Sequence, residues 1–205
     1  MQTKLRIMKD VGDVEVDVRG TEDGIPGNIP IQRIWTARGY GWMAMATSAV
    51  ASLIVRPTTV AIASLYNNSA KNFVIERAFA HNLVSIANGQ FGIWLCVHPV
   101  GRLTSDIPGN GITVRSNTSG LNAGTEGLFD VGATVIDDGW FPWGENSTSV
   151  TATVPGSLAQ ALVEGRIVVP PGAGISISCV SQTAVVTVCC GFHWFSVPTS
   201  EFAVG

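Results

Sequence analysis

The C-terminal stretch, residues 165–205, constrains the fold more than any other part of the sequence. An apolar segment runs into the turn Pro170-Pro171-Gly172, and the alternating segment Ile175-Ser176-Ile177-Ser178-Cys179 follows. A polar pair, Ser181-Gln182, then leads into a β-branched and aromatic run that ends near Val197. Such runs, broken at Pro, Gly and Ser, are typical of antiparallel strands. We therefore expect Ile175, Ile177 and Cys179 to face a core, with Ser176 and Ser178 toward solvent or a small-residue contact.

The composition excludes several classes of protein. Charged residues make up 13% of the 205 residues, against about 25% in typical soluble domains. The formal net charge of −3 predicts no nucleic-acid partner and no anionic membrane partner. The N-terminal residues carry charges throughout, without the apolar centre of a signal peptide, so we expect synthesis and initial residence in a cytosol.

The four cysteines lie inside apolar strand patterns, without the spacing of a zinc site: Cys96, Cys179, Cys189 and Cys190. We predict reduced, buried thiols and no cofactor. The three histidines, His81, His98 and His193, are far apart in the sequence and lack the companions of a cupin-type metal site. We expect each to be a core or surface histidine, with no metal bound.

Residues 1–33 differ in composition from the rest of the chain. Acidic residues alternate with valines in residues 13–19, and a Gly/Pro-rich passage follows in residues 20–30. This pattern predicts an extended arm on a β-sandwich domain of residues 34–205, or else a partly disordered terminus. The apolar residues with which we expect the arm to dock onto the main domain or onto a neighbour are Val14, Val16, Val18, Ile25 and Ile29.

Between the arm and the C-terminal stretch, the pattern is one of short strands and turns. The polar turn at residues 67–71 predicts a β-hairpin, and apolar residues on both faces of residues 90–100 predict a strand covered on both sides. Leu158 and Leu162, one turn apart, predict a short helix over residues 157–163. With about eight to ten strands expected, the fold class is an all-β, antiparallel, jelly-roll-like β-sandwich.

The acidic-aromatic segment at residues 137–146 is the best candidate for a site. Its predicted contact residues, for a glycan or for another subunit, are Asp137, Asp138, Trp140, Trp143 and Glu145. Carboxylates beside aromatic rings suit sugars, and paired carboxylates also suit calcium or glycoside hydrolysis. The favoured interpretation is a loop whose aromatic rings pack on the sandwich or on a neighbouring subunit. No nucleophile-elbow, phosphate-loop or Rossmann motif is present, so we predict a protein that is not an enzyme.

The chain resembles the jelly-roll structural proteins of tailed bacteriophage virions, such as capsid decoration (cement) proteins and head-fibre knob domains. The resemblance rests on residues 20–30, on Tyr66-Asn67-Asn68, on residues 169–174 and on residues 192–198. It implies a β-sandwich, a homotrimer and attachment to a capsid shell.

The leading hypothesis is a virion structural protein, a decoration or cement protein that oligomerises and binds the major capsid protein or other virion proteins through its arm. It would be assembled in the host cytoplasm and reside in the virion. The alternative is a receptor- or glycan-binding knob or fibre domain that uses the acidic-aromatic segment. A glycan hydrolase is the third hypothesis.

Overall fold

The structure is a computed structural model that describes residues 30–46, 50–84, 90–103, 112–120, 126–143, 147–148, 158–183 and 186–201. The chain divides into two units, Met1–Ile34 and Trp35–Gly205. Of the predicted arm, residues 1–29 lie outside the described residues, and with them the predicted contact residues Val14, Val16, Val18, Ile25 and Ile29, which stay a prediction. Residues 31–33 belong to helix α1 (Ile31–Ala37), so this end of the arm is not extended as predicted.

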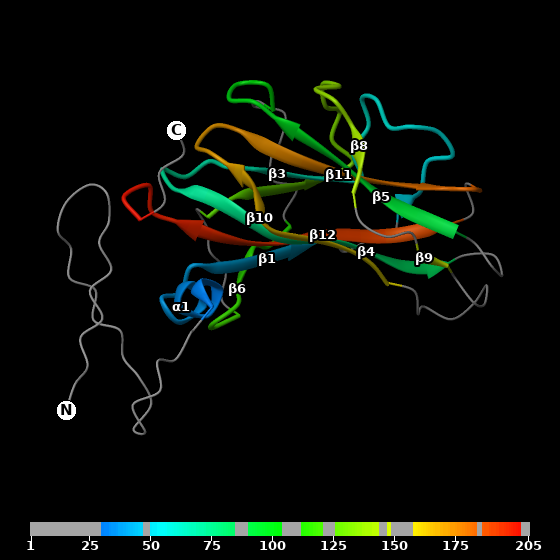
Figure 1. Cartoon of the computed structure of the whole chain (residues 1–205). Helices are drawn as coiled ribbons and strands as arrows, with labels where there is room; N and C mark the ends of the chain where they lie inside the picture. Colours follow the sequence, from blue (N-terminus) through cyan, green and yellow to red (C-terminus); the bar gives the residue numbers. More distant parts are fainter. Residues whose placement is uncertain are drawn as a thin grey trace, which may run out of the picture. The chain divides into compact units, whose positions relative to one another are not determined.

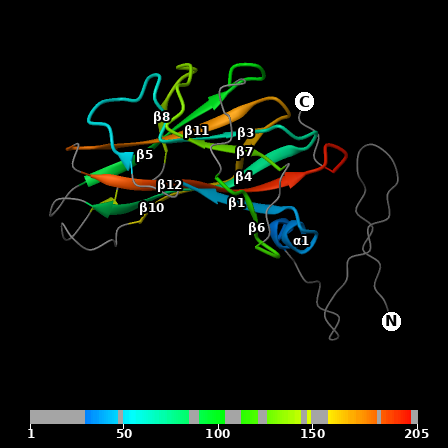
Figure 2. The same ribbon diagram turned by 180° about the vertical axis from the view of Figure 1, so that it is seen from behind.

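The second unit is an antiparallel β-sandwich of two sheets (Figure 1; Figure 2). The first sheet has the strand order β10 (Leu158–Val169), β4 (Asn72–Val84), β12 (Thr187–Val197), β1 (Gly41–Met45), β6 (Arg115–Ser116), with β2 (Val50–Ala51) also paired to β12. The second sheet has the order β7 (Leu128–Val131), β3 (Ala63–Tyr66), β11 (Gly174–Ser181), β5 (Gln90–His98), β8 (Phe141–Pro142), with β9 (Ser147–Thr148) on β5. The predicted all-β sandwich is confirmed.

The C-terminal stretch supplies the central strand of each sheet. β11 lies between β3 and β5, and β12 lies between β4 and β1. Alternate residues of both strands fill the space between the sheets, where Ile175 and Ile177 join Phe192 and Trp194 in the main core. The period-two pattern of these strands therefore predicted the core face correctly.

A further layer covers the outer face of the second sheet. It consists of residues 53–60, 99–103 and 133–140, which we call the outer layer (Figure 1). A separate apolar cluster joins it to the sheet, made of Ala61, Cys96, Leu103, Ala133, Val135 and Trp140. Because of this cover, β5 is buried on both faces, as predicted, while Ser176 and Ser178 are buried and do not face solvent.

The turn at residues 67–71 does not form the predicted hairpin. β3 belongs to the second sheet and β4 to the first, so this turn carries the chain from one sheet to the other. Residues 170–173 make the opposite crossing, from β10 to β11, directly beside it. The buried Asn67 joins the two crossings, because its Nδ2 donates to the Val169 and Lys71 carbonyls at 2.8 and 2.7 Å. A polar turn looks the same in both settings, which is why the hairpin prediction was wrong.

Helix content also differs from the prediction. Residues 158–163, expected to be helical, form the start of strand β10, with Ala159, Ala161 and Val163 in the core. Tertiary packing overrides the helix propensity there. A helix forms instead at α1 (Ile31–Ala37), where the sequence predicted none.

The four cysteines are free and buried, as predicted: Cys96, Cys179, Cys189 and Cys190. Burial raises the pKa of the Cys96 thiol to about 11 and that of Cys179 to about 12. The thiols are therefore protonated and unreactive at neutral pH.

Candidate functional site

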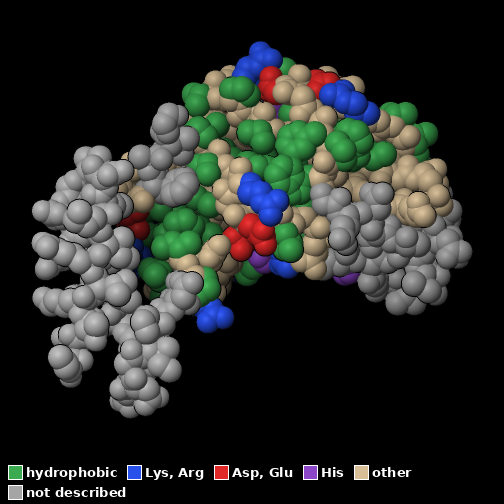
Figure 3. All heavy atoms as spheres, in the orientation of Figure 1, with side chains coloured by type: hydrophobic (Ala, Val, Ile, Leu, Met, Phe, Trp, Pro, Cys, Tyr) green, Lys and Arg blue, Asp and Glu red, His purple; other side chains and the backbone are tan. Residues whose placement is uncertain are grey.

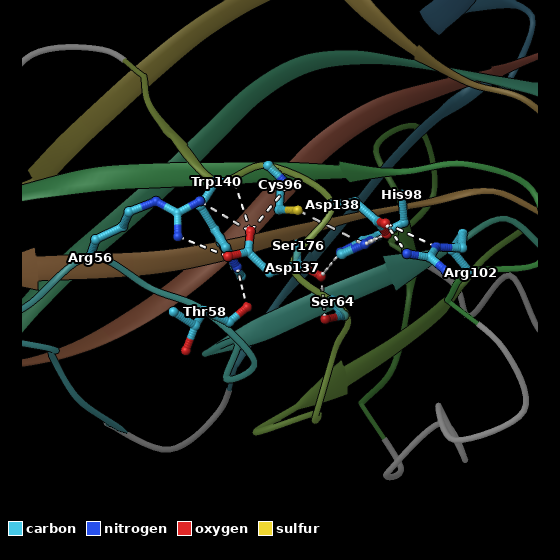
Figure 4. A network of polar contacts seen from close by, with 11 residues as sticks. Arg56, Thr58, Ser64, Cys96, His98, Arg102, Asp137, Asp138, Trp140 and Ser176 are labelled. Carbon is cyan, nitrogen blue, oxygen red and sulfur yellow. Dashed lines mark hydrogen bonds and ion pairs between the residues drawn. The ribbon is translucent and has the colours of Figure 1, made fainter.

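The strongest polar cluster lies between the second sheet and the outer layer (Figure 4). Ser64 on β3, Ser176 on β11 and Cys96 on β5 are register partners, so they form one row across three adjacent strands. His98 follows two residues after Cys96 and therefore points to the same outer face. The row is fully buried, because the outer layer lies over it.

Four side chains of this cluster form a continuous hydrogen-bonded relay. Ser64 Oγ lies 2.8 Å from Ser176 Oγ, which lies 2.8 Å from His98 Nε2. His98 Nδ1 lies 2.9 Å from Asp138 Oδ2, and Asp138 comes from the outer layer. The relay therefore ties the outer layer to the sheet through two serines and a histidine that are fully buried and an aspartate side chain that is 8% exposed.

The charges of the relay follow from its surroundings. Burial lowers the pKa of His98 below its ordinary value, although Asp138 pulls it the other way. Burial alone would raise the pKa of Asp138, but hydrogen bonds from His98 and Arg102 outweigh burial and lower it. At neutral pH a neutral imidazole thus donates from Nδ1 to an ionised carboxylate and accepts from Ser176 at Nε2. Ser64 in turn donates to Ser176.

Two arginines hold the acidic pair from outside. Arg102 Nε and Nη2 lie 2.9 and 2.8 Å from Asp138 Oδ1. Arg56 grips Asp137 with both terminal nitrogens, Nη1 at 2.8 Å and Nη2 at 3.1 Å, and this contact lowers the pKa of Asp137. The loop at residues 133–140 is therefore bonded to two segments of the outer layer, through Asp137 to residues 53–60 and through Asp138 to residues 99–103.

The tryptophan of this loop is part of the protein interior. Trp140 is 4% exposed, packs in the outer-layer cluster and donates from Nε1 to the Thr58 carbonyl at 2.7 Å. Trp143 is half-buried against the main core, and its ring centroid lies 5.5 Å from that of Phe141. A sugar cannot stack on the Trp140 ring unless the loop moves, whereas Trp143 keeps part of its surface outside.

The structure brings together three of the five predicted contact residues, Asp137, Asp138 and Trp140, within one ordered loop. Trp143 lies further along the chain, and Glu145 lies outside the described residues. The packing of these aromatic rings on the sandwich agrees with the favoured interpretation. Contact with a glycan or with a subunit stays a prediction.

The order Ser176, His98, Asp138 is that of a nucleophile, a base and an orienting carboxylate. Here the serine and the histidine are 0% exposed, and Ser176 Oγ is also held by Ser64. In this state the hydrogen bonds fix the proton positions along the four side chains, and the Ser176 hydroxyl is not accessible to a substrate. The sequence singled out Asp138 as a contact residue but did not connect it with Ser176 and His98, because the three are separated by about 40 residues or more. The one available signal was the alternation of Cys96 and His98 on a strand opposite Ser176.

The remaining histidines agree with the sequence prediction. His193 lies on the outer face of the first sheet, opposite its core neighbours Phe192 and Trp194, as the alternation predicted. It contacts Arg77 Nη2 at 3.3 Å, and burial together with this cation lowers its pKa to about 4. Within the described ranges, no group of three or more His, Cys, Asp or Glu residues could hold a metal ion.

Comparisons with known proteins add little. No family model matches the chain, and no curated protein matches it. A solved structure from Mud Crab Dicistrovirus, determined by cryo-electron microscopy, is similar at 8% identity and a TM-score of 0.19, over 95% of this chain and 83% of that chain. A TM-score this low carries no argument. Among the described helices, none is long and apolar enough to cross a membrane.

Proposed function

We propose that the protein is a structural protein of a virus particle, more specifically a capsid decoration or cement protein that works without catalysis. The observation that carries this proposal is the antiparallel β-sandwich itself, the fold that the resemblance implied, in which the strongest polar cluster is buried. A buried relay of this kind stabilises a fold, and it leaves the folded surface to act by contact area.

In this proposal the sandwich is the folded body and the arm, residues 1–33, makes the attachment. Alternating valines and carboxylates suit an extended segment that adds to the edge of a neighbouring sheet through main-chain hydrogen bonds. The partner is the major capsid protein or another virion protein, and the protein itself assembles as an oligomer, which the resemblance makes a homotrimer.

The experiment that tests the proposal is particle binding by the full chain and by a variant that lacks residues 1–29. The full chain should co-sediment with particles devoid of it, and imaging should place it on the shell. The truncated variant should keep the β-sheet circular dichroism of the full chain and lose at least about tenfold in affinity, because arm contacts are removed.

Two results would count against the proposal. Equal binding by the truncated variant would remove the arm from the attachment. No binding by the full chain, together with hydrolysis of a bacterial polysaccharide, would replace the structural function by an enzymatic one.

A further inference from the structure

The surface of the outer layer carries most of the large apolar side chains that the described residues expose. Five of eight such side chains belong to it, with exposed fractions between 42% and 65%: Ile54, Val55, Val60, Val100 and Ile136. Figure 3 shows hydrophobic side chains gathered along this upper surface, between arginines and carboxylates. Exposed apolar groups concentrated on one face mark a place of interaction.

This surface is held in one conformation before any partner arrives. A β-bridge joins Val60 to Thr134, and Val135 N donates to the Thr59 carbonyl at 2.9 Å. The ion pairs of Asp137 and Asp138 and the buried Trp140 fix the same loops to each other and to the sheet. Binding there costs little ordering of the backbone, which favours association.

The charges of the surface point to a partner with the same pattern. Arg56 is paired with Asp137, and Arg102 is paired with Asp138, whose side chain is only 8% exposed. Each arginine is thus neutralised within the chain, so a partner with a strong charge of either sign gains nothing here. Arg56 and Asp137 lie side by side, with side chains 46% and 31% exposed. A two-fold axis beside this pair would bring Arg56 of one copy toward Asp137 of the other, and the reverse, as an isologous interface requires.

We propose that the outer layer is a self-association surface, on which a second copy of this chain packs face to face. Ile54, Val55 and Val60 would form the apolar centre, and the Arg56–Asp137 pairs of the two copies would set the register. This inference rests on the proposed function only in that a shell protein of this kind assembles with itself. An isologous contact joins two copies, so the association proposed here is a dimer and differs from the homotrimer that the resemblance implies.

The opposite side of the sandwich provides a matched control. Leu162 on β10 is 58% exposed, as much as the apolar residues of the outer layer, but it lies on the first sheet. A substitution at Leu162 therefore removes a similarly exposed apolar side chain but leaves the surface of the outer layer unchanged.

The test is the mass of the purified full chain by light scattering from about 1 to about 100 µM, for the wild type and three variants. We expect a concentration-dependent dimer for the wild type and for Leu162→Asp. Val55→Asp and Val60→Asp should weaken association by about tenfold to a hundredfold, because a buried carboxylate replaces an apolar contact. Unchanged circular dichroism and melting temperature would show that these exposed positions leave the fold intact.

A cysteine scan gives a second measurement that does not depend on disruption. The four native thiols are buried, so a short bis-maleimide should react with an added thiol alone. Val60→Cys should yield a covalent dimer, and Leu162→Cys should not.

A wild type that stays monomeric at all concentrations would overturn the proposal, as would association that is unaffected by both aspartate variants. Equal cross-linking at positions 60 and 162 would do the same. A monomer that still binds particles would overturn this inference and leave the attachment by the arm standing. A dimer that binds no particle would support this inference and contradict the proposed function.

Discussion

At the scale of single residues, the buried relay is the feature that most needs explanation. The four side chains of the relay are hydrogen-bonded to one another, from Ser64 through Ser176 and His98 to Asp138. These hydrogen bonds are direct and involve no bridging water. A half-satisfied group at this depth would cost about 1–3 kcal/mol. The relay is therefore stabilising only as a complete set, which makes Asp138 the residue on which the others depend.

Replacement of Asp138 by alanine should lower the free energy of unfolding by about 2–4 kcal/mol, because it leaves a buried imidazole without its acceptor. Asp137→Ala is the matched control: this neighbour forms an exposed, solvent-screened ion pair, so its removal should lower the free energy of unfolding clearly less. Urea denaturation of the two variants measures the difference. Equal losses would show that the relay contributes nothing beyond a surface pair.

Acid should destabilise the protein through its histidines. The folded-state pKa of His193 is about 4, below the value of about 6.5 in an unfolded chain. Between these values the unfolded chain binds more protons, so stability is complete above about pH 6.5 and falls as the pH drops toward 4.

The measurement is the urea midpoint at pH 7 and pH 5 for the wild type and for His193→Gln. Between pH 7 and pH 5, the free energy of unfolding should fall by about 1 kcal/mol less in the variant than in the wild type. The difference is this small because His193 is partly exposed. His98, whose pKa is also lowered, should keep some acid sensitivity in the variant. Identical pH dependence in both proteins would contradict this assignment.

At the scale of elements, the sequence was informative about strands and uninformative about what covers them. Ile175, Ile177 and Cys179 were assigned to the core from their alternation, which is a local property. For Ser176 the prediction left open solvent or a small-residue contact, and the contact with Ser64 is the one found. The cover over it was not predicted, because Asp138 and the rest of the outer layer arrive from distant parts of the chain. The relay could not be predicted for the same reason: its geometry depends on contacts between loops that no periodicity records.

The corner at Asn67 is the element-scale feature with the clearest energetic consequence. Its Nδ2 donates to two carbonyls and its Oδ1 accepts from Ser69 N and Oγ, all at one buried side chain. Asn67→Ala should lower the free energy of unfolding by about 2–4 kcal/mol, since it leaves buried carbonyls without donors.

The exposed neighbour Asn68 serves as the control for Asn67. Its Oδ1 accepts one hydrogen bond, from Gly127 N at 3.0 Å, so Asn68→Ala should cost about 1 kcal/mol or less. Thermal unfolding of both variants compares them directly. A loss at Asn68 as large as that at Asn67 would mean that the junction of the two crossings adds no stability.

At the scale of the whole molecule, the sandwich and its outer layer have different roles. The main core between the sheets stabilises the fold, and the outer layer presents a preformed apolar surface on one side of it. The low content of charged residues, 13%, fits a protein with part of its surface covered in an assembly. That inference and the attachment by the arm concern different surfaces, so the two experiments above separate them.

The central position of β12 has a consequence for how the chain is made. This strand, which ends at Val197, lies between β1 and β4 and joins them into one sheet. During synthesis, the edges of β1 and of the thirteen-residue β4 that pair with β12 therefore stay unpaired until β12 has left the ribosome. Contacts between residues this far apart form slowly, and an unpaired strand edge is open to wrong partners meanwhile. β12 is thus the strand that completes the first sheet.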